Sequence, residues 1–151
     1  MPKPRRQRAS GQTRKAQRVR AFLQAFAEWA RAQPDVMAAA LVGSYANNAA
    51  RTDSDVDLVL IARQPQQYVS NSGWAATFGE MRRQQIEDYG KLTSLRVWYR
   101  NGLEVEYGIT GEEWIAEPLD AGTRRVIEDG MVVLFERGEI LGPHQRADRL
   151  R

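Results

Sequence analysis

The feature that most constrains the fold is a polar segment that joins two short apolar runs, at residues 37–42 and 57–61. Each run has the length and apolar character of a buried β-strand. Gly43 ends the first run, and Asp55 and Asp57 lie where the second begins. Residues two apart on an extended strand point to the same side. The sequence therefore predicts a sheet that holds two carboxylates side by side at the start of a strand.

These paired carboxylates indicate a metal site, because neighbouring like charges repel unless a cation lies between them. The chain has no cysteine and one histidine, His144, which excludes thiolate sites and multi-histidine sites within one chain. We therefore expect Mg²⁺ or Mn²⁺, which carboxylate ligands suit. In phosphoryl transfer, two such ions can activate the attacking oxygen and stabilise the departing pyrophosphate.

The start of the polar segment is suited to binding phosphate. Gly43 lets the backbone approach a ligand closely. Ser44 and the amides that follow it, in a short helix expected within residues 45–50, can donate hydrogen bonds to a triphosphate. Neither a Walker A sequence nor Gly-x-Gly-x-x-Gly occurs in the chain. The simpler alternative for Ser44 is a plain helix N-cap.

The stretch from Gly-Ser-Tyr-Ala to Ser-Asp-Val-Asp-Leu resembles the signature of polymerase β-like nucleotidyltransferases, especially the minimal class. The resemblance implies an α+β (mixed α/β) nucleotidyltransferase fold, with a mixed central β-sheet flanked by helices. It also implies Mg²⁺-dependent transfer of a nucleoside monophosphate, with ATP as the expected donor, and a third carboxylate on a neighbouring strand. Later segments extend the likeness loosely over residues 36–135.

The third carboxylate is expected between residues 103 and 107, where Glu104 and Glu106 lie two apart and share a face of the strand. Alternation alone does not choose between them. Glu106 is favoured because its Val-Glu-Tyr-Gly context matches the position at which the resembled proteins carry Asp or Glu. It also lies deeper in the strand, away from the preceding turn. A solvated strand face remains the alternative for both.

One departure from the resembled pattern concerns the phosphate-binding turn. Many relatives carry Arg-Gly where this chain has Asn47 and Asn48. Asn48 can still adopt a left-handed conformation, so the turn is expected to survive. The missing cation puts affinity for triphosphate in question, and Arg51 is the residue of the same loop that can replace it.

The remaining elements follow from periodicity and from turn residues. Apolar residues at helical spacing predict a helix over residues 15–32. An Asn-Gly pair predicts a hairpin between the last two of three further strands. Asp120 is expected to be the N-cap, and Gly130 the terminator, of a helix. The strands are expected over residues 80–88, 92–99, 103–109 and 131–135.

Charge divides the chain unevenly. Eight of the 22 basic residues lie among the first twenty, without an acid, and the remaining 14 face 19 acidic residues. We expect residues 1–14 to form a disordered basic tail, 15–140 a nucleotidyltransferase domain, and 141–151 a polar C-terminal tail. No apolar stretch is long enough for a membrane span or a secretory signal, which favours a cytoplasmic protein. Nucleic acid is an improbable partner, except for weak contact with the basic tail.

The tryptophans are interpreted mainly as core residues. Trp29, Trp98 and Trp114 occur in segments with apolar periodicity. Trp74 lies in the polar connection of residues 64–78, for which one short helix is expected, and it is the single tryptophan considered for stacking on a nucleobase.

Three functions compete at this stage. The first is a metal-dependent enzyme that transfers a nucleoside monophosphate, with AMP expected, to a hydroxyl of a small molecule or protein. The second is a nucleotidyltransferase antitoxin that modifies or masks a helical toxin. The third is a nucleotide-binding module without turnover, motivated by Asn47. The shortness of the chain suggests that a helical partner or a second copy completes the acceptor site.

Overall fold

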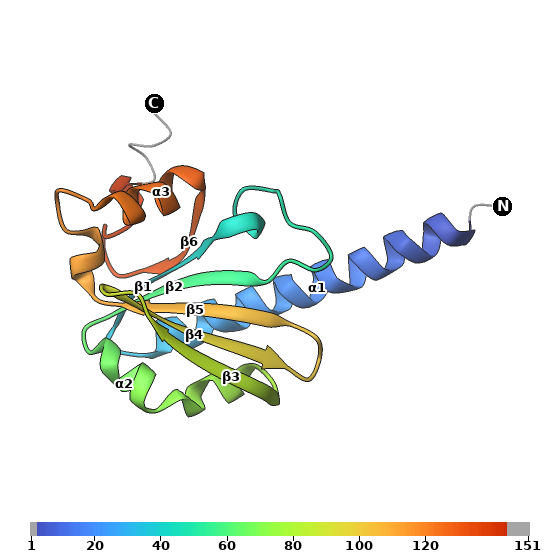
Figure 1. The fold of residues 1–151 in the computed structure, drawn as a ribbon, viewed down its shortest axis with the longest axis horizontal. Helices are drawn as coiled ribbons and strands as arrows, with labels where there is room; N and C mark the ends of the chain where they lie inside the picture. Colours follow the sequence, from blue (N-terminus) through green and yellow to red (C-terminus); the bar gives the residue numbers. More distant parts are fainter. Residues whose placement is uncertain (1–2, 145–151) are drawn as a thin grey trace.

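The computed structural model describes residues 3–144, with side chains from Arg14 onward. Its centre is a six-stranded sheet with the order β3-β4-β5-β2-β1-β6 (Figure 1). The strands, in chain order, are β1 (Val36–Val42), β2 (Val56–Ala62), β3 (Met81–Asp88), β4 (Leu92–Tyr99), β5 (Glu104–Thr110) and β6 (Met131–Glu136).

Strand directions make the sheet mixed, as expected. β2 and β5 run parallel, whereas every other neighbouring pair is antiparallel. Each strand predicted from the sequence is present, and its bounds agree to within a residue or two. The predicted hairpin joins β4 to β5, where Gly102 adopts a φ of 94° in the turn. The α+β class with a mixed central sheet is therefore confirmed.

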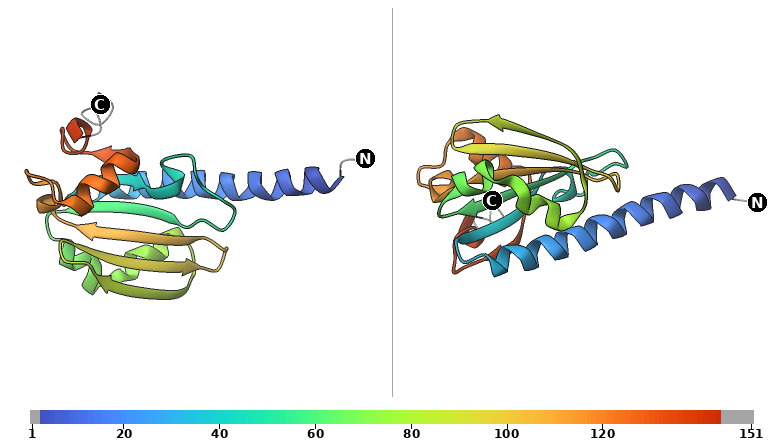
Figure 2. Two further views of the ribbon diagram at one scale, coloured as in Figure 1. Left: turned by 45° about the horizontal axis from the view of Figure 1, so that its top comes forward. Right: turned by 90° about the horizontal axis from the view of Figure 1, so that it is seen from below.

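Helix α1 (Lys3–Ala32) lies along one face of the sheet, and its first turns extend beyond the sheet (Figure 2). Its buried residues repeat at helical spacing and are Val19, Phe22, Phe26 and Ala30. The helix begins at Lys3, not at Lys15, and so runs through most of the segment for which a disordered basic tail is expected. Arg, Lys, Gln and Ala are favourable helix residues, and a proline is tolerated in the first turn.

An aromatic core fills the space between this sheet face and α1, α2 (Pro65–Ser70) and the 3-10 segment η2 (Ser72–Phe78). Trp74 belongs to this core: its ring stacks on Trp29 at a centroid distance of 4.8 Å and meets Tyr107 edge-on at 4.8 Å. Its indole N–H donates to the carbonyl of Tyr68 at 2.9 Å. The one tryptophan considered for nucleobase stacking is therefore a core residue, since Tyr107 points away from the sheet face that carries Glu106.

The opposite face is covered at one end by α3 (Ala121–Asp129) and the 3-10 segment η3 (Glu112–Ile115). Asp120 is the N-cap of α3, and its carboxylate accepts from the N–H of Thr123 at 2.8 Å. Gly130 follows the helix with a φ of 127°. Trp114 packs here with 5% of its surface exposed. The predicted helix and its cap are confirmed, and the rest of this face carries polar side chains.

The C-terminal part of the described chain is packed rather than free. Leu141 is fully buried, and one carboxylate oxygen of Glu136 accepts from the N–H groups of Ile140, Leu141 and Gly142. The expected polar tail of residues 141–151 thus begins inside the fold, and residues 145–151 lie outside the described part. No helix within residues 3–144 combines the length and apolar character that crossing a membrane requires.

Candidate active site

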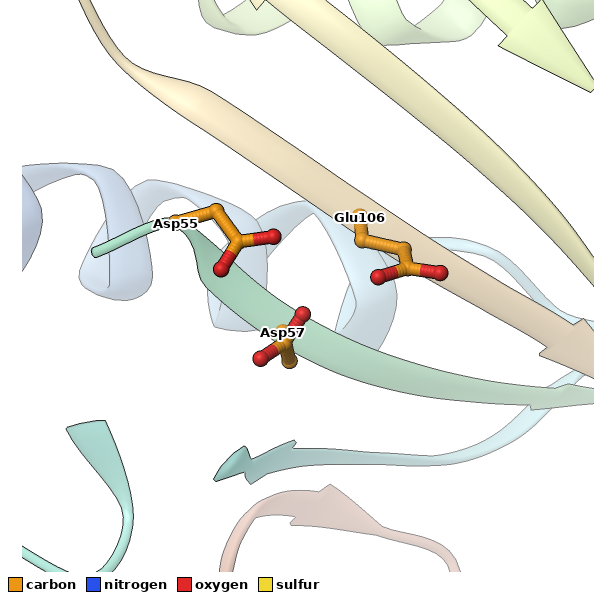
Figure 3. A group of neighbouring side chains, drawn as sticks. All are labelled: Asp55, Asp57 and Glu106. Carbon is orange, nitrogen blue, oxygen red and sulfur yellow. The ribbon is translucent and has the colours of Figure 1, made fainter. Parts of the chain in front are cut away.

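Two parallel strands bring the predicted carboxylates together. Asp57 on β2 is paired in register with Glu106 on β5, and both lie on the face opposite the aromatic core. Asp55 lies just before β2 and approaches the same point (Figure 3). One carboxylate oxygen from each of the three residues lies within 4.8 Å of the other two. We call Asp55, Asp57 and Glu106 the acidic triad.

Gly43 lies directly beside the triad. It begins the single 3-10 turn η1 (Gly43–Tyr45), with a φ of 73° that favours glycine. A Cβ at this position would lie 3.1 Å from Cγ of Asp57 and closer still to Oδ2. The carbonyl of Gly43 accepts from the N–H of Ala46 at 3.0 Å. Both the backbone conformation and the approach of Asp57 therefore require glycine.

The other residues of the predicted phosphate-binding loop differ in how close they lie to the triad. Ser44 is half-buried in η1, next to Gly43. Asn48 has a φ of 63°, which confirms its expected left-handed conformation. Arg51 is exposed and lines a separate depression with Lys15 and Tyr45, so the structure does not bring its side chain into the pocket that contains Asp57 and Glu106.

The two glutamates of β5 have different surroundings. Glu104 shares the face of Glu106, but its carboxylate accepts from the indole N–H of Trp98 at 3.0 Å and pairs with Arg96. Glu106 accepts from the hydroxyl of the buried Ser94 at 2.8 Å. Only Glu106 joins the group of three described carboxylates that can share an ion. This geometry favours Glu106 over Glu104 as the third carboxylate.

Arg96 is the site residue that sequence reasoning missed. Its guanidinium lies 3.1 Å from Oδ2 of Asp55 and 3.0 Å from Oε2 of Glu106, and it also pairs with Glu104. On β4, Arg96 is the cross-strand neighbour of Glu106. The alternation of polar and apolar residues over 94–99 assigns Arg96 to a polar face. Its contact with the triad also requires the register between β4 and β5, which the sequence does not reveal.

The electrostatics of the triad favour a cation. Burial, followed by the negative charges of Asp55 and Glu106, raises the pKa of Asp57 from 3.8 to about 7, and the charge of Arg96 acts in the opposite direction. The single guanidinium therefore leaves the negative charge only partly neutralised. Three converging carboxylates are hard oxygen ligands of the kind that Mg²⁺ and Mn²⁺ take, so the donor set fits such an ion.

A pocket of about 530 Å³ extends from Asp57 and Glu106 beneath α3. Gly43, Asp57 and Glu106 lie at one end, and Leu92 and Trp114 contribute to an apolar lining further along. This size lies within the range of small-ligand sites. The pocket thus joins two carboxylates of the triad to an apolar surface.

Fold and sequence pattern together place the chain in the polymerase β-like nucleotidyltransferase superfamily. The chain belongs to the streptomycin adenylyltransferase family, whose sequence pattern matches residues 16–102. The match includes Gly43, Asp55 and Asp57 and ends before Glu106.

Comparison with solved structures agrees in fold. The chain is similar to an aminoglycoside 6-adenyltransferase from Bacillus subtilis, with 12% sequence identity and a TM-score of 0.50. The similarity covers 62% of this chain and 35% of that chain, so this protein matches about a third of that enzyme's length. No curated protein sequence matches the chain.

Proposed function

We propose that this chain transfers a nucleoside monophosphate, AMP, from a nucleoside triphosphate to a hydroxyl group. The observation that carries the proposal is the convergence of Asp55, Asp57 and Glu106, whose oxygens approach within 4.8 Å beside the turn at Gly43. The family sequence pattern, which is that of an adenylyltransferase, supports ATP as the donor.

In this proposal the triad holds Mg²⁺ or Mn²⁺, which when bound withdraws charge from the α-phosphate and stabilises the leaving pyrophosphate. Gly43 leaves room for the phosphates, and the hydroxyl of Ser44 donates a hydrogen bond to them. The nucleoside lies in the pocket beneath α3, where Trp114 contributes to the lining. Arg51 has no part in this proposal because it lines a different depression.

The reaction balances as a single displacement at phosphorus. The acceptor oxygen forms a bond to the α-phosphorus while the bond from that phosphorus to the bridging oxygen of the β-phosphate breaks. Pyrophosphate leaves with the electron pair, and the hydroxyl proton passes to a carboxylate of the triad. The acceptor approaches over the open face of β4 and β5. Because the chain matches about a third of the related enzyme's length, we infer that another polypeptide segment or subunit completes the acceptor site.

The test is to incubate the purified protein with each nucleoside triphosphate, Mg²⁺ and candidate acceptors, including a cell extract. Pyrophosphate release and the mass of nucleotidylated products are then measured. Asp55→Asn is expected to abolish both signals. Asp53→Asn is the matched control, because Asp53 lies in the same loop but is exposed and outside the triad. Equal product formation by wild type and Asp55→Asn would refute the catalytic proposal.

A nucleotide-binding module without turnover is the second candidate. Asn47 stands where the resembled proteins carry arginine, and the side chain of Arg51 does not line the pocket of the triad. Nucleotide binding that depends on Asp57 but never yields pyrophosphate would favour this function over transfer.

A further inference from the structure

The guanidinium of Arg96 pairs with three carboxylates. One nitrogen, Nη1, pairs with Asp55 at 3.1 Å and also with Glu104, and the other, Nη2, pairs with Glu106 at 3.0 Å. The Arg96 side chain is 31% exposed, so solvent only partly screens these contacts. Arg96 thus bridges two members of the acidic triad and one carboxylate outside it.

Other cations near this face are engaged elsewhere. Arg83 on β3 stacks on the ring of Trp98 at 4.7 Å, and Lys91 pairs with Asp120 at 3.4 Å. Among the residues that the structure describes, Arg96 is the single cation in ion-pair contact with the triad. The balance of charge at Asp55 and Glu106 in the metal-free protein therefore depends on one side chain.

A divalent ion bound by the triad would compete with this guanidinium for Asp55 and Glu106. Both are positive, so an ion held by Asp55 and Glu106 repels Arg96 at short range. Glu104 offers Arg96 an alternative, because its carboxylate lies outside the triad and is held in place by the indole N–H of Trp98.

We propose that Arg96 is a displaceable counter-cation of the metal site. In the metal-free protein it neutralises Asp55 and Glu106, and when a divalent ion binds it releases them and stays paired with Glu104. This inference rests on the proposed binding of metal by the triad, and it assigns separate tasks to the two glutamates of β5. Glu106 binds the ion, whereas Glu104 retains the arginine.

The main test measures binding of Mn²⁺ alone to metal-free protein by calorimetry. Arg96→Met keeps much of the side-chain length but removes the charge and is expected to bind Mn²⁺ at least about tenfold more tightly, since an adjacent opposite charge shifts carboxylate affinity by about one to three pKa units. The same variant is expected to melt at a lower temperature than wild type without metal, because the carboxylates then repel unopposed. Arg83→Met is the matched control, and neither quantity is expected to change.

A second variant keeps the test decisive if Arg96→Met does not fold. Arg96→Lys keeps the charge but loses the planar fork that holds two carboxylates at once. Its Mn²⁺ affinity is expected to lie between those of wild type and Arg96→Met. If Arg96→Met does not fold, unchanged or weaker binding by Arg96→Lys overturns the proposal.

The role of Glu104 is tested by a double-mutant cycle with Arg96. Glu104→Gln removes the site that retains the arginine and is expected to weaken Mn²⁺ binding more than fivefold in wild type, but less than twofold in Arg96→Met. Equal weakening in both backgrounds would indicate loss of negative charge alone and would overturn the displacement. If wild type binds no Mn²⁺, the proposed metal function itself fails. If wild type binds Mn²⁺ but Arg96→Met binds no more tightly, only the role of Arg96 fails.

Discussion

Asp57→Asn is expected to stabilise the metal-free protein at neutral pH, although it removes a carboxylate from the site. In the folded chain, burial and the charges of Asp55 and Glu106 raise the pKa of Asp57 to about 7, compared with 3.8 for an unperturbed aspartate. The folded state therefore holds a proton that the unfolded state has already lost between these two pH values. Asparagine occupies the same volume, carries no charge and can donate to the neighbouring carboxylates as a protonated aspartate does.

The magnitude follows from the shift. About three pKa units correspond to about 4 kcal/mol at 1.36 kcal/mol per unit, which is an upper bound. Asp57 is only half-buried, and solvent screening reduces this to about 1–2 kcal/mol. For a domain of this size, such a change raises Tm by about 2–8 °C.

The sign depends on pH in a defined way. Because the folded pKa is raised, ionised Asp57 lowers the free energy of unfolding, and this effect is absent below about pH 4 and complete above about pH 7. The stability difference between Asp57→Asn and wild type is therefore expected to be smallest at pH 4 and to grow up to pH 7–8.

The assay is urea denaturation in a chelator at several pH values between 4 and 8, repeated with Mg²⁺. Bound Mg²⁺ is expected to stabilise wild type, by about 1.4 kcal/mol at ten times its dissociation constant, and to leave Asp57→Asn unchanged. Asp53→Asn serves as the exposed control. Lower stability of Asp57→Asn than of wild type at pH 8 in chelator, or a difference that does not grow with pH, would refute the reasoning.

Three further substitutions test how the site is supported. Gly43→Ala is expected to lower the free energy of unfolding by about 2 kcal/mol or more in urea denaturation, because it combines a positive φ with a Cβ clash. Gly102→Ala, with a φ of 94° and no atom within 4 Å of the added Cβ, measures the backbone contribution alone. An equal loss in both variants would argue against the clash. Lys15→Met removes an ammonium group that donates to two carbonyls of the loop before Asp55, and a severalfold loss of Mn²⁺ affinity with little loss of stability is expected in calorimetry. Asp120→Ala removes the N-cap of α3 and is expected to cost about 1 kcal/mol in thermal denaturation; an unchanged Tm would contradict the capping role.

Much of the fold was predictable because local patterns and global structure agree. The polar and apolar alternation around Glu106 assigns that residue to the face opposite Tyr107, as observed. Asp120 and Gly130 mark the ends of α3 by capping chemistry that depends on neighbouring residues alone. Asp55 and Asp57 were recognisable for a similar reason, since their spacing on an extended segment decides that they converge.

Sequence reasoning reaches least far for residues whose environment is set by distant parts of the chain. Trp74 lies in a polar stretch of sequence, yet Trp29 and Tyr107, far away in the chain, enclose its ring. Arg51 follows the phosphate-binding turn closely, but its loop carries its side chain to a depression beside α1. Proximity in sequence therefore gave no indication of the packing of Trp74 or of the separate depression that Arg51 lines.

Arg96 belongs to the site although it lies outside the sequence motif. The motif supplies negative charge, and a chain folded without metal needs a positive charge at the same place. That charge comes from β4, through a cross-strand pairing with Glu106. The strand order places this arginine within reach of Asp55 as well, whereas the alternation in β5 gives it Glu104 as a further partner. A site that binds a metal ion transiently is thus expected to include a side-chain cation that binds the same carboxylates more weakly. That cation is identified from the strand register rather than from the spacing of the acids.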